Sequence, residues 1–129
     1  MKKELTIILV VITFIVIINL ITQQYTKSSI SALNDNLYKI KDELMKEEID
    51  EQDVQKKIED NYNLWLKKER VLSYYIEHDE LEKIGAHLNL IKGYMETKKY
   101  DDSISSIEET IFIYSHIQDK YKIYLKNVF

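Results

Sequence analysis

The sequence carries no charged residue from Leu5 to Thr26, and this stretch constrains the fold more than any other feature. Its part up to Ile21 is apolar except for Thr6, Thr13 and Asn19. About 20 helical residues, at about 1.5 Å of rise each, cross the roughly 30 Å hydrocarbon core of a bilayer. A single segment in lipid satisfies its backbone hydrogen bonds only as a helix. Residues 1–26 are therefore predicted to form a transmembrane anchor.

A cleaved signal peptide is the competing interpretation, because Lys2 and Lys3 before an apolar run also fit that pattern. The run of about 17 residues is longer than the usual apolar region of a signal peptide, and no Ala-x-Ala cleavage site follows it. The nearest pair of small residues, Ser29 and Ser31, lies well past its end. We therefore expect an uncleaved anchor.

Basic residues on the two sides of the apolar run predict its orientation. Lys2, Lys3 and the amino terminus crowd one side, whereas the other side has Lys27 and then no basic residue until Lys39. This distribution favours a single-pass protein of the cell membrane with a cytoplasmic N-terminus. Residues 27–129 are then extracytoplasmic, which leaves the chain without a cytoplasmic output domain.

Composition excludes several classes of fold, site and partner for residues 27–129. The chain has no Cys, no Pro and two Gly, which removes disulfides, thiolate metal sites and the turns of most β-rich folds. Residues 27–129 hold 16 basic and 21 acidic residues, a net charge of −5. This acidic balance argues against nucleic acid and against an anionic lipid surface as partners.

Apolar residues recur at spacings of three and four through the rest of the chain, which predicts amphipathic helices. The first helix continues without a break from the membrane segment to about Glu48. Asp50 and Asp53 supply a cap-like start to a second helix, and Asp79 with Glu82 has capping-box spacing at the start of a third. The three apolar stripes are Ile30, Leu33, Leu37, Ile40 and Leu44; Val54, Ile58, Tyr62, Trp65, Leu72 and Ile76; and Leu81, Ile84, Leu88, Ile91 and Met95.

A fourth helix is predicted to follow Asp101 and Asp102, whose charges suit a helix N-terminus. The expected fold class is all-α: the transmembrane helix continues into an antiparallel bundle of three to four helices over residues 27–129, with its most regular hairpin at 79–125. The stripe of the fourth helix is Ile104, Ile107, Ile111, Tyr114, Ile117, Tyr121, Tyr124 and Leu125.

Two groups of residues are candidates for an interaction surface. Gly85, Asn89 and Gly93 follow one another at intervals of four, which fits either a local kink or the close approach of another helix. The second group is aromatic and fits either core packing or an exposed patch that docks a protein or a glycan. It includes Trp65, Tyr74 and Tyr75, with His78 beside them at a predicted helix junction.

No motif for catalysis, a cofactor or a metal is recognisable. His78, His87 and His116 are isolated in sequence and have no zinc-ligand spacing. The acidic stretch that starts at Asp50 lacks the sixth-position glycine of a calcium-binding EF-hand loop and has Gln52 and Val54 at the third and fifth positions. We therefore expect a protein that is not an enzyme and that holds no cofactor or metal.

Several features resemble the uncharacterised domain-of-unknown-function family 4363, and with the apolar helix they cover nearly the whole chain. They are Trp65, the run Val71–Lys83, the turn at Lys99 and Tyr100, and His116 and Ile117 before a Tyr-rich end. The resemblance implies a small single-span membrane protein of Gram-positive, often spore-forming, bacteria. It also implies an association with small multi-pass membrane proteins, and it assigns no activity.

The main functional hypothesis is a membrane-anchored interaction or accessory module that binds a partner membrane protein. The alternative is an extracytoplasmic ligand-sensing bundle that forms a homodimer and acts through a partner. The stripe from Ile30 to Leu44 motivates this alternative, because its spacing is that of a coiled-coil seam.

Overall fold

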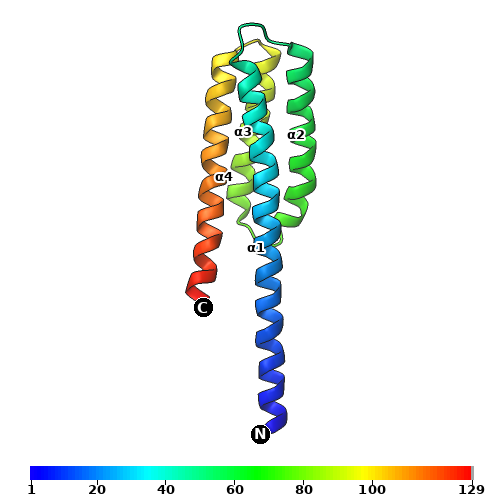
Figure 1. The fold of residues 1–129 in the computed structure, drawn as a ribbon, viewed down its shortest axis with the longest axis vertical. Coiled ribbons are helices and arrows are strands. Elements are labelled where there is room, and N and C mark those ends of the chain that lie inside the picture. The colour runs from blue at the N-terminus through cyan, green and yellow to red at the C-terminus, as the bar shows by residue number, and fades with distance from the viewer. Residues whose placement is uncertain (129) are drawn as a thin grey trace.

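The computed structural model describes residues 1–128, with side chains up to Lys122, and folds into four α-helices. Each helix packs against its neighbours in sequence, and α1 also packs against α4, so the four form a closed antiparallel ring (Figure 1). The predicted all-α bundle is thereby confirmed. The helices are α1 (Lys2–Leu44), α2 (Glu51–Leu72), α3 (His78–Glu96) and α4 (Tyr100–Val128).

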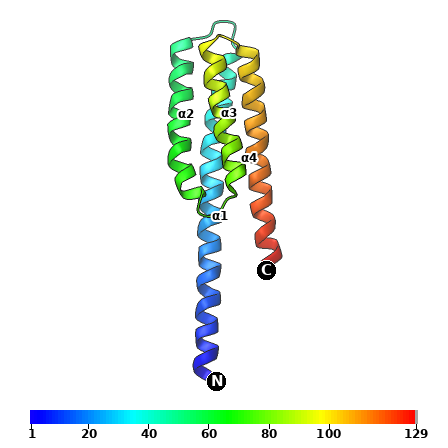
Figure 2. The same ribbon diagram turned by 180° about the vertical axis from the view of Figure 1, so that it is seen from behind.

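Helix α1 is about twice as long as the bundle needs, and its N-terminal half projects from one end of the bundle (Figures 1 and 2). The C-terminal turns of α4 extend past the α2–α3 loop in the same direction. The two chain ends therefore lie on the same side of the bundle. The α1–α2 and α3–α4 loops lie together at the opposite end, which we call the far end.

The predicted apolar stripes form the core. All five stripe residues of α1 and all five of α3 are at most 4% exposed. In α2 the stripe is buried except for Tyr62, and Ile76 is buried although it lies beyond the end of the helix. In α4, Ile107, Tyr114 and Ile117 are buried, whereas Ile104, Ile111 and Tyr121 are partly buried. The predicted Tyr124 and Leu125 side chains lie outside the described residues.

Burial of the α1 stripe corrects one part of the dimerisation hypothesis. The residues from Ile30 to Leu44 pack against the other helices of the same chain and leave no apolar seam for a second copy. A stripe with coiled-coil spacing serves equally well inside a bundle, because both use the same interdigitating side-chain geometry.

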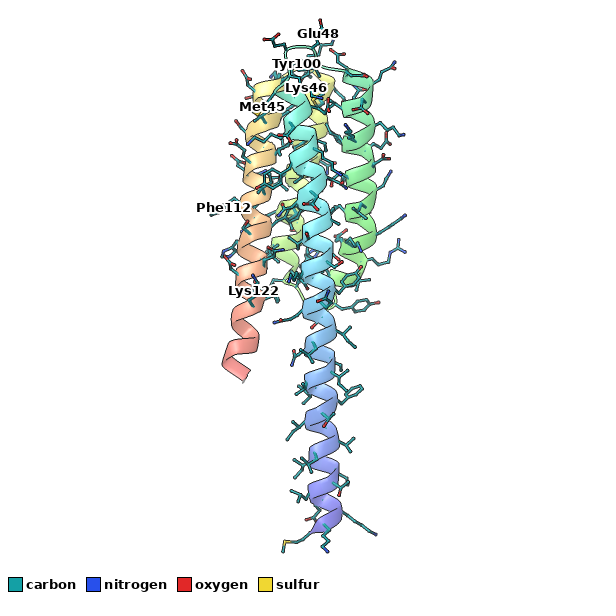
Figure 3. All side chains as sticks on the ribbon, viewed as in Figure 1. Met45, Lys46, Glu48, Tyr100, Phe112 and Lys122 are labelled. Carbon is teal, nitrogen blue, oxygen red and sulfur yellow. The ribbon has the colours of Figure 1, made fainter. Side chains whose placement is uncertain are left out.

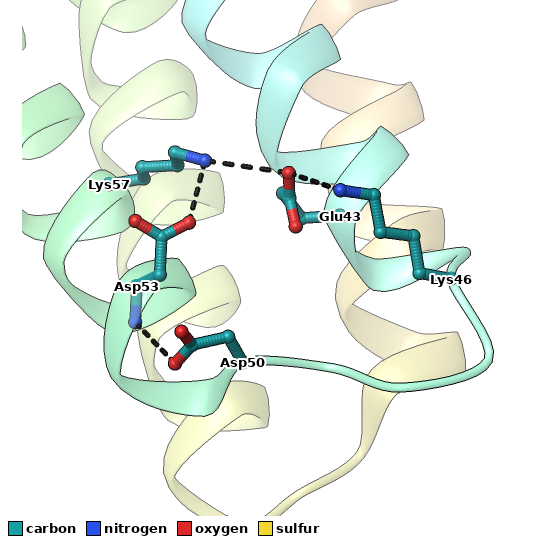
Figure 4. Close-up of polar contacts among 5 residues, drawn as sticks. All are labelled: Glu43, Lys46, Asp50, Asp53 and Lys57. Carbon is teal, nitrogen blue, oxygen red and sulfur yellow. Dashed lines mark hydrogen bonds and ion pairs between the residues drawn. The ribbon is translucent and has the colours of Figure 1, made fainter.

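The α1–α2 loop is fastened by a short chain of polar contacts (Figure 4). Asp50 caps α2 as predicted, since its carboxylate accepts a hydrogen bond from the Asp53 N–H at 3.2 Å. The Asp53 carboxylate lies 2.7 Å from the Lys57 Nζ, which is also 3.7 Å from Glu43 of α1. Glu43 in turn accepts from Lys46 at 2.7 Å. These contacts hold the end of α1, at Leu44, beside the start of α2.

The predicted capping box at Asp79 is wrong. Helix α3 begins at His78, and Glu77 occupies the N-cap position without a side-chain hydrogen bond. The Glu77 carbonyl accepts from the N–H groups of Glu80 and Leu81 at 3.1 and 3.3 Å. Asp79 therefore lies within the first turn, where its charge still suits the positive end of the helix dipole.

Candidate functional site

The projecting half of α1 is apolar on all sides and uncovered. None of its side chains from Leu5 to Ile21 is buried, and its exposed large apolar side chains range from 45% exposed at Ile18 to 63% at Phe14. Soluble proteins rarely expose a continuous apolar surface of more than a few hundred Å². The segment is long and apolar enough for a membrane anchor or a signal sequence.

Contacts from three elements converge where α1 enters the bundle, and we call this place the junction. The α2–α3 loop and the turn of α4 that carries Lys120 and Tyr121 surround one turn of α1, and the end of α2 supplies a lysine. The junction consists of Thr22, Gln23, Tyr25, Thr26, Lys68, Tyr75, Glu77, Glu80, Lys120 and Tyr121.

Tyr75 ties the α2–α3 loop to α1. Its hydroxyl donates to the Thr22 carbonyl at 3.2 Å and lies 2.7 Å from the Thr26 Oγ1. Thr26 also donates to the Thr22 carbonyl at 2.8 Å, so this one carbonyl oxygen accepts hydrogen bonds from both the Tyr75 and the Thr26 hydroxyls. Burial raises the pKa of the Tyr75 phenol above its usual value of 10.0, which keeps the hydroxyl protonated as a donor.

Tyr121 ties α4 to the same turn of α1. The Gln23 side-chain amide donates to the Tyr121 carbonyl at 2.9 Å, and the Tyr121 hydroxyl accepts from the Glu77 N–H at 3.3 Å. The Tyr121 and Tyr75 rings meet edge to face with centroids 6.4 Å apart. Such aromatic pairs add stabilisation beyond the area that they bury.

Two cations complete the junction. The Lys120 Nζ lies 3.0 Å from both the Glu77 and the Glu80 carboxylates, and these two hydrogen bonds raise the pKa of the ammonium. The Lys68 Nζ lies 5.0 Å from the centre of the Tyr25 ring, within the range of a cation–π contact. The first turn of α1 inside the bundle is therefore held by α2, by α4 and by the loop between α2 and α3.

A half-open groove of about 340 Å³ lies between α1 and α4 beside the junction. Lys122, which lines it, lies at the level where α1 leaves the bundle (Figure 3). The groove is lined by Leu20, Gln23, Gln24, Thr26, Lys27, Gln118, Tyr121 and Lys122.

The predicted aromatic group divides between core and surface. Trp65 is only 2% exposed and its indole fills the bundle core, so for this residue core packing holds and the exposed-patch interpretation does not. Tyr74 is 86% exposed, and Tyr75 belongs to the junction. His78 is exposed at the start of α3, where its Nε2 lies 2.9 Å from Glu82.

The predicted strip of small residues does not form one contact surface within this chain. A Cβ added to Gly85 would lie 3.7 Å from the Trp65 Nε1, which is an ordinary contact. A Cβ added to Gly93 would meet nothing within 4 Å, and Asn89 is exposed. Binding of another protein to the strip stays a prediction.

Sequence reasoning missed most of the junction. Tyr121 was placed in the stripe of α4, but Gln23, Thr26 and Lys120 carried no motif that marked them. Gln23 and Thr26 lie just past the apolar run that ends at Ile21, which was the one usable signal for them, and nothing in the sequence marked Lys120. Within the part of the chain that the structure describes, no group of three or more His, Asp or Glu could hold a metal ion.

Comparison with known proteins gives one match. The model of a family described as a domain of unknown function (DUF4363) matches residues 20–128, which include the junction and nearly all of the bundle. No curated protein and no solved structure matches the chain. The match covers most of the sequence and confirms the resemblance found in its residues, so the chain belongs to the DUF4363 family.

Proposed function

We propose that the protein is a membrane-anchored interaction module whose single span binds a helix of a partner membrane protein. Residues 5–21 cross the membrane, the N-terminus is cytoplasmic, and the bundle stands on the outer face. One observation carries the proposal: an uncovered apolar segment continues, within one unbroken helix, into a bundle that buries its own stripe. The orientation follows from the basic residues before the span.

The connection between the span and the bundle is rigid in this proposal. Helix α1 runs through 43 residues, about 65 Å at 1.5 Å per residue. The junction bonds its first turn inside the bundle to α4 and to the α2–α3 loop. A tilt or rotation of the span imposed by a partner would therefore move the whole bundle, because no flexible linker separates the two.

One face of the span offers a surface for a helical partner. A shallow groove there is lined by Thr6, Leu9, Val10, Thr13, Phe14 and Ile17. The Thr6 and Thr13 hydroxyls donate to carbonyls one turn earlier, at 2.9 and 2.8 Å, so the two small residues of this face, which lie seven residues apart among larger apolar side chains, leave no hydroxyl donor unsatisfied. Faces with small side chains let helices approach closely in membranes, where packing rather than hydrophobicity drives association.

Topology is tested with single cysteines, since the natural chain has none. Lys3→Cys lies before the span, and Glu48→Cys lies at the far end of the bundle (Figure 3). A membrane-impermeant maleimide should label Glu48→Cys in intact cells, and Lys3→Cys only after lysis. Labelling of Lys3→Cys alone in intact cells would reverse the orientation and contradict the proposal.

The partner is tested by photo-crosslinking from within the span. A photoreactive amino acid at Val10 or Phe14 lies on the grooved face, and one at Ile8 or Ile15 lies on the opposite face of the same helix. We expect a discrete protein adduct from the grooved face and much weaker adducts from the opposite face. Equal yields from both faces, or adducts with lipid alone, would contradict a specific partner helix.

A further inference from the structure

We infer that the groove between α1 and α4 binds the phosphate head group of an anionic phospholipid. This inference rests on the proposed function, because it requires residues 5–21 to span a membrane. The groove begins at Leu20, at the end of the apolar segment, and continues along polar residues of α1 and α4. When the segment spans a bilayer, the groove therefore lies at the depth of the lipid head groups.

Two lysines from different helices give the groove its charge. Lys27 of α1 and Lys122 of α4 both line it, and neither is ion-paired to an acidic side chain among the described residues. Lys120, two residues before Lys122 on α4, is by contrast ion-paired to Glu77 and Glu80. Two free ammonium groups at one groove suit a phosphate diester, which each contacts as a point charge.

The remaining lining suits the rest of a phospholipid. Three side-chain amides, those of Gln23, Gln24 and Gln118, line the groove. Gln24 and Gln118 can donate to phosphate or glycerol oxygens, as can the second N–H of the Gln23 amide, whose nitrogen already donates to the Tyr121 carbonyl. Leu20 lies at the apolar end, where an acyl chain would begin. The groove volume of about 340 Å³ is enough for a head group but not for a whole lipid, whose chains would lie along the exposed span.

The bundle carries most of its negative charge in the half that lies away from the groove, as binding to an anionic lipid would require. The half beside the junction, residues 27–33, 62–86 and 112–122, holds seven basic and six acidic residues. The far half, residues 34–61 and 87–111, holds eight basic and fifteen acidic residues. The net charges are +1 and −7, so an anionic membrane surface attracts the near half and repels the far half.

The test uses the full chain in nanodiscs that contain phosphatidylglycerol and phosphatidylcholine in equal amounts. Native mass spectrometry after detergent release measures how much of each lipid stays bound. The double variant Lys27→Gln and Lys122→Gln removes both charges. The matched control, Lys39→Gln and Lys56→Gln, removes two exposed lysines of the far half that have no ion pair among the described residues.

We expect the natural chain and the control to retain phosphatidylglycerol, and the double variant to retain about 25-fold less, since each lysine near an anionic surface strengthens binding about fivefold. Equal retention by all three proteins would overturn the head-group site, as would displacement of the lipid by millimolar inorganic phosphate. Carbonate-resistant insertion, measured on membranes of the cells that express the same proteins, reports the span itself. Its failure would overturn the proposed function and the head-group site together.

Discussion

Helix α1 contains two segments rich in apolar residues, of which one is uncovered and the other is packed inside the bundle. Residues 5–21 bury no side chain, whereas the part from Thr26 to Leu44 buries seven. The first segment is richer in apolar residues, so hydrophobicity alone does not predict which part packs inside the chain. Spacing does: the second segment places its apolar residues on one stripe, and polar residues cover its other faces.

The comparison explains how one helix can suit both lipid, along its all-apolar segment, and a bundle core, along its striped segment. An all-round apolar helix has no preferred face for a bundle but meets lipid equally well on every side. A striped helix has one face to bury and would expose charges to lipid, which costs several kcal/mol for each charge. The junction lies where one pattern gives way to the other, between Ile21 and Thr26.

The largest expected effect comes from charging the first segment. Val10→Lys together with Thr13→Lys places two ammonium groups in the middle of the proposed span, each at a cost of about 2.5–3.5 kcal/mol. We expect the variant to leave the membrane pellet during carbonate extraction. Asn89→Lys with Leu90→Lys, on an exposed face of α3, should leave membrane retention unchanged. Full retention of the Val10→Lys, Thr13→Lys variant in the pellet would show that residues 5–21 do not cross the hydrocarbon core.

The second prediction tests whether the two segments are energetically separate. Leu37→Ala removes a side chain that is 1% exposed, and this should lower the free energy of unfolding by about 2–5 kcal/mol. Leu9→Ala, in the segment that buries nothing, should leave it unchanged. Fluorescence of the single, buried Trp65 during urea unfolding in detergent reports the bundle alone. Equal losses from both variants would show that the first segment also packs against the bundle.

The core was predictable from sequence because its signal is local. The spacing that places Ile30, Leu88 and Ile107 inside can be read within a few turns of each helix. The start of α3 was less predictable: the capping-box pattern fits Asp79, but the buried Ile76 and the contacts of Glu77 start the helix earlier.

The junction could not be predicted in the same way, because its bonds join residues far apart in the chain. The contact between Thr26 and Tyr75 spans 49 positions, and that between Gln23 and Tyr121 spans 98. The net charge of −5 also conceals the distribution of charge, because the two halves of the bundle carry +1 and −7 and Lys126 lies outside both. Only the fold shows which charges lie beside the projecting apolar segment.

A third prediction concerns the place where the two segments meet. Tyr75→Phe removes the hydroxyl that binds the Thr22 carbonyl and Thr26, and it should destabilise the bundle by about 0.5–1.5 kcal/mol. The neighbouring Tyr74→Phe is the matched control, because Tyr74 is 86% exposed and should tolerate the change. Urea unfolding followed by Trp65 fluorescence measures both. Equal effects would mean that the junction bonds do not stabilise the entry of α1.

The smallest effect is expected at the far end, which the first segment does not reach. The Tyr100 hydroxyl donates to the Glu51 carboxylate at 2.6 Å, and Lys98 lies 3.4 Å away. These two contacts, Tyr100 foremost, hold the pKa of Glu51 below its usual value of 4.5. The carboxylate therefore stabilises the fold at pH values above 4.5, and this stabilisation is lost as the pH falls through the lower folded value.

Glu51→Gln should accordingly lower the urea midpoint slightly at pH 6, and its deficit relative to the natural chain should be smaller at pH 3. Glu48→Gln is the matched control, because Glu48 is exposed and has no ion pair among the described residues. Its midpoint should follow that of the natural chain at both pH values. A Glu51→Gln deficit of the same size at pH 3 would show that shape rather than charge holds Glu51 against Tyr100. The far end of the bundle would then owe its stability to packing, as the middle of the second segment does.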